Sequence, residues 1–366
     1  MSASLKVLHV ITGLGTGGAE TMLCSLVERT RGQVDQHVVS LVKGGASAEW
    51  LQRRDIPTTH LGMAKGMPDP RAIWRLRKLI QEYKPHIIQS WMYHADLMAA
   101  LARGSLMWPP SSRPRLAWGI RCSDMDLRRY GWGLNLVVKT NARLSTTPDT
   151  IIVNSHAGKK AHINLGYNAK KMQVILNGID TQRFSPNLAM RQIMRSKLGI
   201  PEETPVLIHI ARVDPMKDHA TLLAAAQNFP GVLLLVGAGT ESMGNSTSIR
   251  GLGRRDDIPD LIAAADVLVS SSAFGEGFPN VVAEAMSCEV PAVVTDVGDS
   301  AYIVKDTGIV VSPNSPQELS AALNYIIGEG RKSLQQRGRS ARLRVESEFS
   351  LNRAGQSFVH MWQGLV

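Results

Sequence analysis

The sequence predicts an α/β protein with two domains, each built around a largely parallel sheet. A length of 366 residues suits two domains of ordinary size. Short β-branched runs alternate with longer helix-like segments, which is typical of successive βαβ units. The turn-forming segment 177–180, Asn-Gly-Ile-Asp, interrupts this alternation, and the same pattern then restarts. We therefore predict one domain over residues 1–176 and a second over 177–349.

In the first half, short apolar runs predict buried strands with helices between them. Asp69 followed by Pro70 predicts a helix that begins there and ends at Tyr83, because Pro85 stops it. Ser155 is the expected N-cap of another helix. The predicted strands cover residues 5–11, 37–42, 86–90, 115–120, 149–153 and 172–176.

The second half repeats the alternation of strands and helices. Helices are expected over 220–228 and 259–265, a further one begins at Pro279, and the chain reads as helical from Pro316 onward. The predicted strands cover residues 205–210, 231–236, a short run near 249, 266–270, 291–295, 302–304 and 308–311.

Composition is that of a globular protein that stays in a reducing compartment. Cys24, Cys122 and Cys288 are isolated and lack the spacing of metal ligands, so we expect free thiols. The first ten residues lead directly into a strand without the features of a signal peptide. No apolar run approaches the ~20 residues that a membrane span needs. These observations predict a cytoplasmic protein.

The stretch FGEGFPNVVAEAM joins two predicted strands and carries two carboxylates beside a helix start. Pro279 suits the first turn of a helix, so the free N–H groups of Asn280 and Val281 are available to an anion such as a phosphate. Glu276 lies in the loop, and Glu284 lies about one turn beyond Asn280. Carboxylates beside an anion site suit neighbouring hydroxyl groups. Together these groups predict a nucleoside diphosphate sugar as ligand.

Glu276 and Glu284, in the context EGFPNVVAE, resemble the E-x7-E motif of the retaining glycosyltransferases of family 4. The resemblance implies the GT-B fold, in which two Rossmann-like domains face each other across a cleft. It implies that Glu284 binds the ribose hydroxyls and Glu276 the hydroxyls of the donor sugar. It also implies that residues 350–366 cross back to the first domain. Further donor-binding residues on this motif are Gly277, Phe278, Asn280 and Val281.

Arg212 and Lys217 follow a predicted strand and come before the next helix. An arginine fork and a lysine ammonium together can neutralise a leaving diphosphate. The segment resembles the G-R-x5-K element of the same family. Here Ala211 replaces the glycine before the arginine, and Asp218 with His219 replaces the glycine after the lysine.

The first strand is followed by a glycine-rich loop in which Gly13, Gly15 and Gly18 spell G-x-G-x-x-G, a dinucleotide-binding fingerprint. NAD binding also needs an acid after the second strand, where this chain has Lys43 and two glycines. The fingerprint alone is therefore weak support for NAD. In the resembled family this loop approaches the donor from the opposite domain, which implies that Gly17 and Gly18 bind the donor.

Two further candidates lie in the first half. His94, in SWMYHADL, follows a strand and resembles the histidine that family members place near the donor sugar, although an N-capping or packing role fits equally well. Arg121 ends another strand and is a candidate for binding an acceptor phosphate. Asp124 and Asp126 spell D-x-D, a metal-binding pattern in another glycosyltransferase fold, but arginines crowd them. We therefore expect no metal and no other cofactor.

The sequence thus predicts a retaining, metal-independent hexosyltransferase that moves a sugar from a nucleoside diphosphate sugar to a hydroxyl acceptor. The alternative is a nucleotide-sugar 2-epimerase of the same fold, which needs no acceptor. A binding protein without activity is a third interpretation, disfavoured because all four donor residues (Arg212, Lys217, Glu276 and Glu284) are present.

Positive charge is concentrated in one part of the first half. Residues 65–145 contain 14 Lys+Arg against 5 Asp+Glu, a net charge of +9 in a chain whose total is +10. Five tryptophans also lie there: Trp74, Trp91, Trp108, Trp118 and Trp132. Cations with aromatic residues suit an anionic membrane surface, and no nucleic-acid-binding motif accompanies them. We expect peripheral attachment to the cytoplasmic membrane face and a lipid-linked or polysaccharide-precursor acceptor. The competing interpretation is buried tryptophans and solvated cations.

Overall fold

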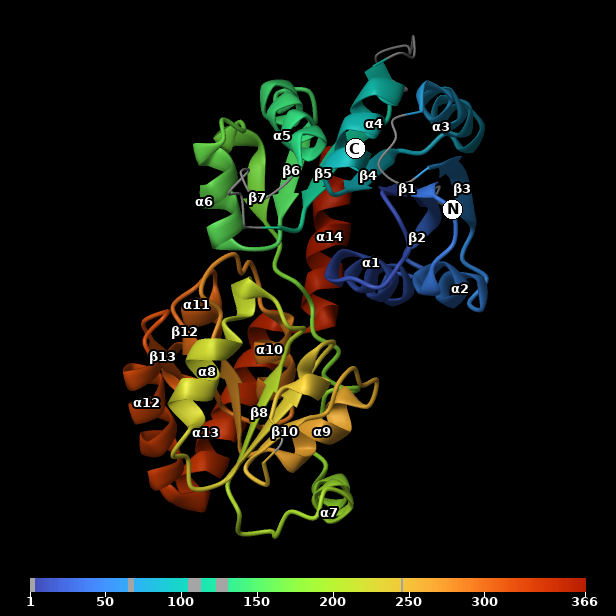
Figure 1. Ribbon diagram of the computed structural model, residues 1–366. Helices are drawn as coiled ribbons and strands as arrows, with labels where there is room; N and C mark the ends of the chain where they lie inside the picture. The colour runs from blue at the N-terminus through green and yellow to red at the C-terminus, as the bar shows by residue number, and fades with distance from the viewer. Residues whose placement is uncertain (1–3, 65–68, 105–112, 123–130, 245) are drawn as a thin grey trace. The chain divides into compact units, whose positions relative to one another are not determined.

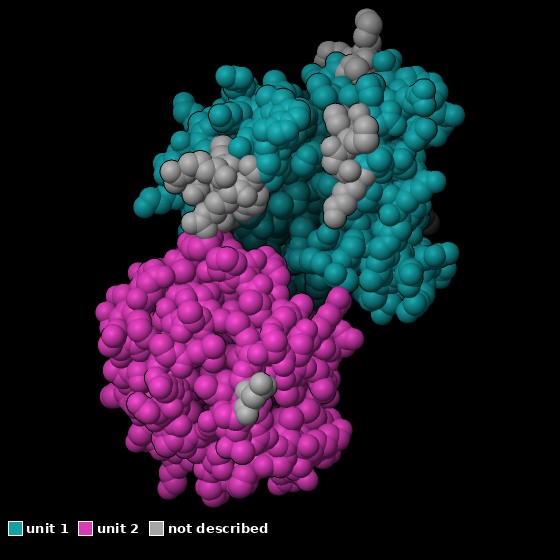
Figure 2. Space-filling view, in the orientation of Figure 1, with its two compact units in different colours: residues 1–178, 351–366 teal, residues 179–350 magenta. Residues whose placement is uncertain are grey.

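The computed structural model describes residues 4–64, 69–104, 113–122, 131–244 and 246–366. The chain forms two compact units, shown in different colours in Figure 2. Unit 1 consists of residues Met1–Gly178 and Leu351–Val366, and unit 2 of Ile179–Ser350.

Unit 1 is built on a seven-stranded parallel sheet in the order β3-β2-β1-β4-β5-β6-β7. The order reverses between β1 and β4, and ligands of such sheets bind at the carboxyl ends of the strands near this reversal. The strands are β1 (Leu5–Ile11), β2 (Val34–Val42), β3 (Thr58–Met63), β4 (Ile87–Trp91), β5 (Arg115–Ile120), β6 (Thr150–Val153) and β7 (Met172–Val174).

Helices cover both faces of this sheet (Figure 1). One core contains side chains of α3, α4 and α5, and the other contains side chains of α1, α2 and α14. Asp69 caps α3 by accepting from Arg71 N, and Ser155 caps α6 by accepting from Gly158 N. The helices are α1 (Gly18–Arg29), α2 (Ala46–Gln52), α3 (Pro70–Tyr83), α4 (Tyr93–Gly104), α5 (Trp132–Leu144), α6 (His156–Asn164), η3 (Ala169–Lys171) and α14 (Leu351–Leu365).

The last helix, α14, packs in unit 1. Phe358 and Trp362 are fully buried there, and Trp362 Nε1 donates a hydrogen bond of 3.2 Å to Gln89 Oε1. Trp91 stacks on Phe358 with 6.0 Å between the ring centroids. The aromatic side chains of α14 therefore complete one of the two cores of unit 1.

Unit 2 contains a six-stranded parallel sheet in the order β10-β9-β8-β11-β12-β13. Its strands are β8 (Val206–Ile210), β9 (Val232–Val236), β10 (Ile249–Gly251), β11 (Val267–Ser270), β12 (Ala292–Thr295) and β13 (Ile309–Val311). Its helices are α7 (Leu188–Lys197), η4 (Pro215–Lys217), α8 (His219–Ala226), η5 (Thr240–Ser242), α9 (Ile258–Ala264), α10 (Asn280–Ser287), α11 (Ser300–Val304), η6 (Lys305–Thr307), α12 (Pro316–Gly328), α13 (Gly330–Arg344) and η7 (Val345–Phe349).

One predicted element was wrong, and one observed strand was not predicted. Residues 302–304 form the end of helix α11, not a strand: Ile303 and Val304 are buried while Tyr302 is exposed, and three residues are too few to distinguish the two periods. Strand β3 was not predicted at all. It lies at the sheet edge, and its sequence TTHLGM is only partly buried, so the apolar signal is weak.

The predicted aromatic cluster also needs correction. Trp91 and Trp118 are fully buried in the two cores of unit 1, so neither contributes to a surface. Trp74 and Trp132 are 65% and 83% exposed. Trp108 lies outside the described residues. Two of the five tryptophans therefore belong to the core, as the competing interpretation has it.

Candidate active site

Four loops meet at the carboxyl edge of the sheet in unit 2. They follow β8, β9, β11 and β12. The loops after β8 and β11 are joined directly: Ser271 Oγ donates to Lys217 O at 2.8 Å, and Ala273 N donates to Met216 O at 2.9 Å. The loop that carries Arg212 and Lys217 is therefore hydrogen-bonded directly to the loop that carries Glu276.

Glycine makes the approach of the β8 and β9 loops possible. Val213 N donates to Ala238 O at 2.9 Å, which pairs the two loops. Gly237 has φ of +146°, and a Cβ there would lie 2.1 Å from Ala211 O. No side chain fits at this distance, so position 237 requires glycine.

The β12 loop approaches the backbone of Glu276 equally closely. Gly298 has φ of +66°, and a Cβ there would lie 2.3 Å from Glu276 O. Asp299 N donates to Gly277 O at 2.9 Å, and Thr295 Oγ1 donates to Ser272 O at 2.6 Å. This support could not be predicted from the sequence, because a close approach of two backbones leaves no motif there.

Glu276 forms an ion pair with Lys217 in the centre of these loops. The carboxylate is buried, with a residue exposure of 8%, and Ser272 Oγ donates to the same Oε1 at 2.6 Å. Both contacts use Oε1, so Oε2 is the oxygen available to a ligand hydroxyl. The structure thus brings together two of the predicted site residues and adds Ser272 to them.

Arg212 lies at the same sheet edge but is paired differently. Its Nε and Nη2 donate to Asp214 Oδ2 at 3.1 and 2.8 Å, and its side chain is 64% exposed. Asp214 also caps η4 by accepting from Met216 N at 2.9 Å. Asp214 therefore orients the guanidinium at the loop surface, where it is accessible to an anion.

Asp218 explains one departure from the resembled family. Its backbone is left-handed, with φ of +45°, at the position where that family has glycine. Aspartate is among the few residues that tolerate this conformation. Its side chain then caps α8 by accepting from Thr221 N at 3.1 Å. The altered residue therefore keeps the loop conformation that glycine would give.

Helix α10 begins one residue later than the sequence predicts. Pro279 is the N-cap with φ of −70°, and the helix starts at Asn280, followed by Val281. The ring of Phe278 packs edge-on against Phe349, with 5.6 Å between centroids, so its side chain belongs to the core. The side chain of Phe278 is 5% exposed, so it is not available to a ligand.

Glu284 lies in the second turn of α10 and is strongly desolvated. Burial raises the pKa of its carboxyl from 4.5 to about 7, and the charge of Arg183 opposes this shift. A carboxyl group in this state gains from ligand hydroxyls that replace the lost water.

Changing Glu284 to Gln is expected to weaken donor binding and to stabilise the unliganded protein. The loss of charge-assisted hydrogen bonds costs about 1.5–3 kcal/mol of binding free energy.

Because the folded-state pKa of Glu284 is raised, the contribution of Glu284 to stability is fully present below about pH 4.5 and is lost as the pH rises through about 7. E284Q should therefore unfold at a higher temperature than the wild type at pH 8. Calorimetric titration and thermal unfolding measure the two effects, and normal donor affinity in the variant would contradict the ribose assignment.

The predicted residues of unit 1 lie in its own loops. Gly17 caps α1, and a Cβ there would lie 2.5 Å from Glu20 Oε2, which is the end of a flexible side chain. A Cβ at Gly18 would meet no atom within 4 Å. His94 is the second residue of α4 and is exposed, and partial burial of its ring lowers its pKa.

Arg121 directly follows β5, and contacts with other residues of unit 1 hold its guanidinium in place. Its Nη1 donates to Asn177 Oδ1 at 2.8 Å, and its guanidinium lies over the rings of Trp91 and Phe358, at 4.7 and 5.4 Å from their centroids. Its Nε and Nη2 are buried without a partner, and burial lowers its pKa to about 9.

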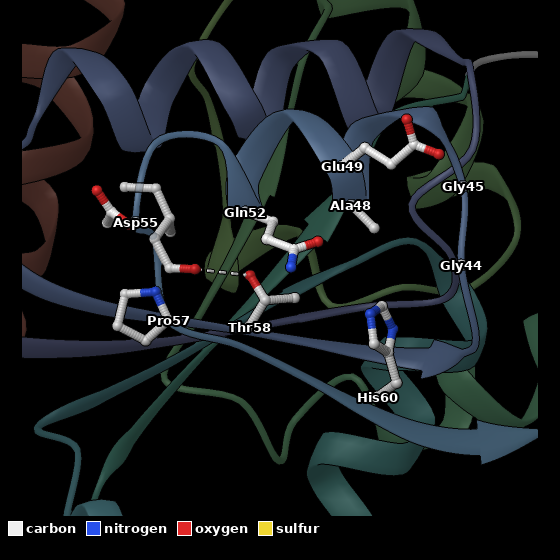
Figure 3. A pocket seen from close by; sticks show the side chains of 10 residues that line it. Gly44, Gly45, Ala48, Glu49, Gln52, Asp55, Pro57, Thr58 and His60 are labelled. Atoms are coloured by element: carbon white, nitrogen blue, oxygen red, sulfur yellow. Dashed lines mark hydrogen bonds between the residues drawn. The ribbon is translucent and has the colours of Figure 1, made fainter.

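Unit 1 also contains a pocket of about 650 Å³ between α2 and β3 (Figure 3). Its polar lining includes Glu49 and Gln52 from α2 and His60 from β3. None of the predicted site residues lines it. Gly45, which does, has φ of +113°, and a Cβ there would lie 2.1 Å from Leu14 O in the glycine-rich loop.

The described residues contain no group of three or more His, Cys, Asp or Glu side chains that could hold a metal ion. Asp124 and Asp126 lie outside the described part of the chain. No helix among the described residues is long and apolar enough to cross a membrane.

Comparison with known proteins assigns each half of the chain. Residues 16–183 match the family described as Glycosyltransferase Family 4, and residues 190–344 match Glycosyl transferases group 1. D-inositol 3-phosphate glycosyltransferases of Mycobacterium bovis and Mycobacterium tuberculosis are 28% identical over 199 residues, 49% of this chain and 41% of the relative. The chain thus spans less than half the length of these curated relatives.

Solved structures resemble the whole fold. Anabaena HepE in complex with UDP superposes with a TM-score of 0.83 at 24% identity, over 98% of this chain and 100% of that one. Sucrose-phosphate synthase from Thermosynechococcus elongatus superposes with a TM-score of 0.79 at 17% identity, over 98% and 99%. Both halves of the chain match glycosyltransferase families and each unit has a Rossmann-like parallel sheet, so the chain belongs to the family 4 glycosyltransferases of the GT-B fold.

Proposed function

We propose that the protein is a retaining, metal-independent hexosyltransferase that uses a nucleoside diphosphate sugar. The observation that carries the proposal is the cluster of Lys217, Ser272 and Glu276 beside the start of α10, with Glu284 one turn into that helix. HepE structures in complex with UDP and with UDP-glucose support this donor class.

The donor-binding residues differ in the part of the donor that they contact in this proposal. Glu284 binds the ribose hydroxyls, Glu276 Oε2 accepts from a hydroxyl of the sugar, and the first N–H groups of α10 contact the diphosphate. Arg212 and Lys217 stabilise the diphosphate as negative charge develops on it. That interaction is stronger in the transition state than in the ground state, so it lowers the barrier.

The reaction exchanges one bond for another at the anomeric carbon of the sugar. The bond to the diphosphate oxygen breaks, and the acceptor oxygen forms its bond on the same face. The leaving diphosphate takes the acceptor proton, so the protein supplies no general base. In unit 1, His94 and the loop at Gly17 and Gly18 contribute to positioning the sugar.

The proposal predicts that nucleoside diphosphate accumulates only when a hydroxyl acceptor is added to the protein and a sugar nucleotide. R212A and K217A should depress turnover, and EDTA should leave wild-type activity unchanged. Release of a 2-epimer without acceptor would identify an epimerase instead. Full activity in either variant, or loss of activity with EDTA, would remove this account of diphosphate stabilisation.

We also propose that unit 1 attaches to an anionic membrane surface, where a lipid-linked acceptor is available. Helices α3 and α5 flank α4 over one core of unit 1 (Figure 1), and Trp74 and Trp132 project from them. Helix α5 contains no acidic residue, and neither helix has one in its first turn. The exposed cations of the two helices are Arg71, Arg75, Lys78, Lys139 and Arg143.

Sedimentation with vesicles tests the membrane proposal. The protein should bind vesicles that contain phosphatidylglycerol and not vesicles of phosphatidylcholine alone, and binding should fall with salt, since exposed charges are screened beyond ~10 Å at 0.1 M. W74A/W132A should lose binding. The control Y325A/L343A removes side chains that are 64% and 65% exposed in unit 2 and should bind normally. Equal recovery in the supernatant with both kinds of vesicle at low salt would refute the proposal.

A further inference from the structure

The turn that presents His94 has a strained backbone. Met92 lies between β4 and α4 and has φ of +72°. This left-handed backbone conformation is rare for residues other than glycine, asparagine and aspartate. Two residues later the chain presents His94 in the first turn of α4. Since such strain persists only where the surrounding structure enforces it, the contacts of this turn are informative.

Two backbone hydrogen bonds fix the turn. Met92 N donates to Gly119 O at 2.7 Å, and Asp96 N donates to Met92 O at 2.9 Å. Strand β5 approaches the end of β4 very closely here: a Cβ added at Gly119 would lie only 2.5 Å from Ser90 O. Gly119 is therefore the residue of β5 against which the strained turn is held.

The side chain of Asp96 connects all parts of this arrangement. Its Oδ1 accepts from Ser90 Oγ at 2.6 Å, at the end of β4, and from Gly119 N at 3.3 Å, in β5. Asp96 itself is in the first turn of α4. One carboxyl oxygen thus links the strand before the turn, the helix after it and the neighbouring strand.

The links to Ser90 and Gly119 account for a carboxyl group at this position. Asp96 is fully buried, no cation among the described residues shifts its pKa, and burial raises that pKa to about 8. Its second oxygen, Oδ2, is buried and has no hydrogen-bond partner in the described part of the chain. Burial of a carboxyl group in this way is unfavourable, and the links to Ser90 and Gly119 offset it.

We propose that Asp96 is a positioning residue: it holds Met92 in its left-handed conformation and thereby fixes where His94 lies. The proposal rests on the proposed function in one respect, that His94 acts on the transferring sugar. The structural part, coupling between Asp96 and Met92, is independent of any activity.

Coupling between the two positions tests the proposal. Glycine adopts positive φ without strain, so M92G should rescue D96A. We expect D96A to lower the Tm of unit 1, followed by tryptophan fluorescence because all seven tryptophans lie in that unit, and D96A/M92G to regain at least half of the loss. The change in Tm caused by M92G should differ between D96A and the wild type. The control is Lys84, also left-handed with φ of +50° but at the end of α3, so K84G should change the Tm equally in D96A and in the wild type.

A second readout concerns His94 itself. In NMR titrations, with the His94 signal assigned through H94Q, D96A should shift the pKa of His94 and D96A/M92G should restore it. D96N keeps an oxygen that accepts from Ser90 and Gly119, so it should leave that pKa unchanged. In the transfer assay D96A should lower kcat more than it raises the KM for donor. Additive effects of D96A and M92G on Tm, or an unchanged His94 titration in D96A, would overturn the proposal even if transfer is demonstrated.

Discussion

Replacing Lys217 with methionine is expected to abolish transfer and to destabilise unit 2 by about 3–5 kcal/mol, the cost of removing one partner of a buried ion pair. The side chains of Lys217 and Glu276 are only 18% and 9% exposed. Without the ammonium, Glu276 is left with Ser272 as its hydrogen-bond donor. Loss of a preorganised cation at a leaving diphosphate should lower kcat at least ~100-fold.

A double variant separates the two effects. K217M/E276Q removes both charges and leaves an amide that accepts from Ser272, so it should recover most of the lost stability while remaining inactive. Unit 2 contains no tryptophan, so the unfolding transition seen by fluorescence should stay at its wild-type position while the circular dichroism transition moves. Wild-type stability in K217M would show that the ion pair contributes nothing to unit 2.

Alanine at position 298 is expected to lower the stability of unit 2 by about 2–6 kcal/mol, the combined cost of a strained backbone and of overpacking. Gly298 has φ of +66°, and the new Cβ would lie 2.3 Å from Glu276 O. Backbone atoms cannot swing aside as a flexible side chain does. Glu276 must therefore move, and donor affinity should fall together with stability.

Gly328 provides the matched control for this substitution. It is the last residue of α12 in unit 2, and a Cβ there would meet no atom within 4 Å. G328A should therefore be neutral or slightly stabilising, because alanine favours the helix. Thermal unfolding and donor titration of both variants decide the matter. Similar behaviour of G298A and G328A would mean that the close approach at Glu276 is unimportant.

Strand prediction from the sequence succeeded where burial is continuous. Strands β1 and β5 have the predicted bounds, and five consecutive residues are buried in each of them, Val7–Ile11 and Leu116–Ile120. It failed where the run is short or the strand lies at an edge. The three residues 302–304 end a helix, and β3 has polar side chains on a half-buried edge.

The candidate site shows a similar division. Charged residues in the segments that follow strands, such as Lys217 and Glu276, could be predicted from the sequence because they lie between a strand and the next helix in a βαβ pattern. The residues that shape the loops were not. Nothing in the sequence distinguishes Ser272 from other serines or Gly298 from other glycines. Their roles follow from contacts in the fold, since Ser272 Oγ lies 2.6 Å from Glu276 Oε1 and the backbone of Gly298 lies against that of Glu276. Contacts between segments far apart in sequence require the fold itself.

The path of α14 has a consequence for synthesis on the ribosome. Phe358 and Trp362 complete a core of unit 1, yet they are translated only after the whole of unit 2. Unit 2 is a continuous segment and domains fold as units, so it is able to fold while unit 1 still lacks its last helix. Until then, the apolar side chains that α14 covers, among them Trp91, are open to chaperones. Unit 1 is therefore the first unit whose synthesis begins and the last unit whose folding is completed.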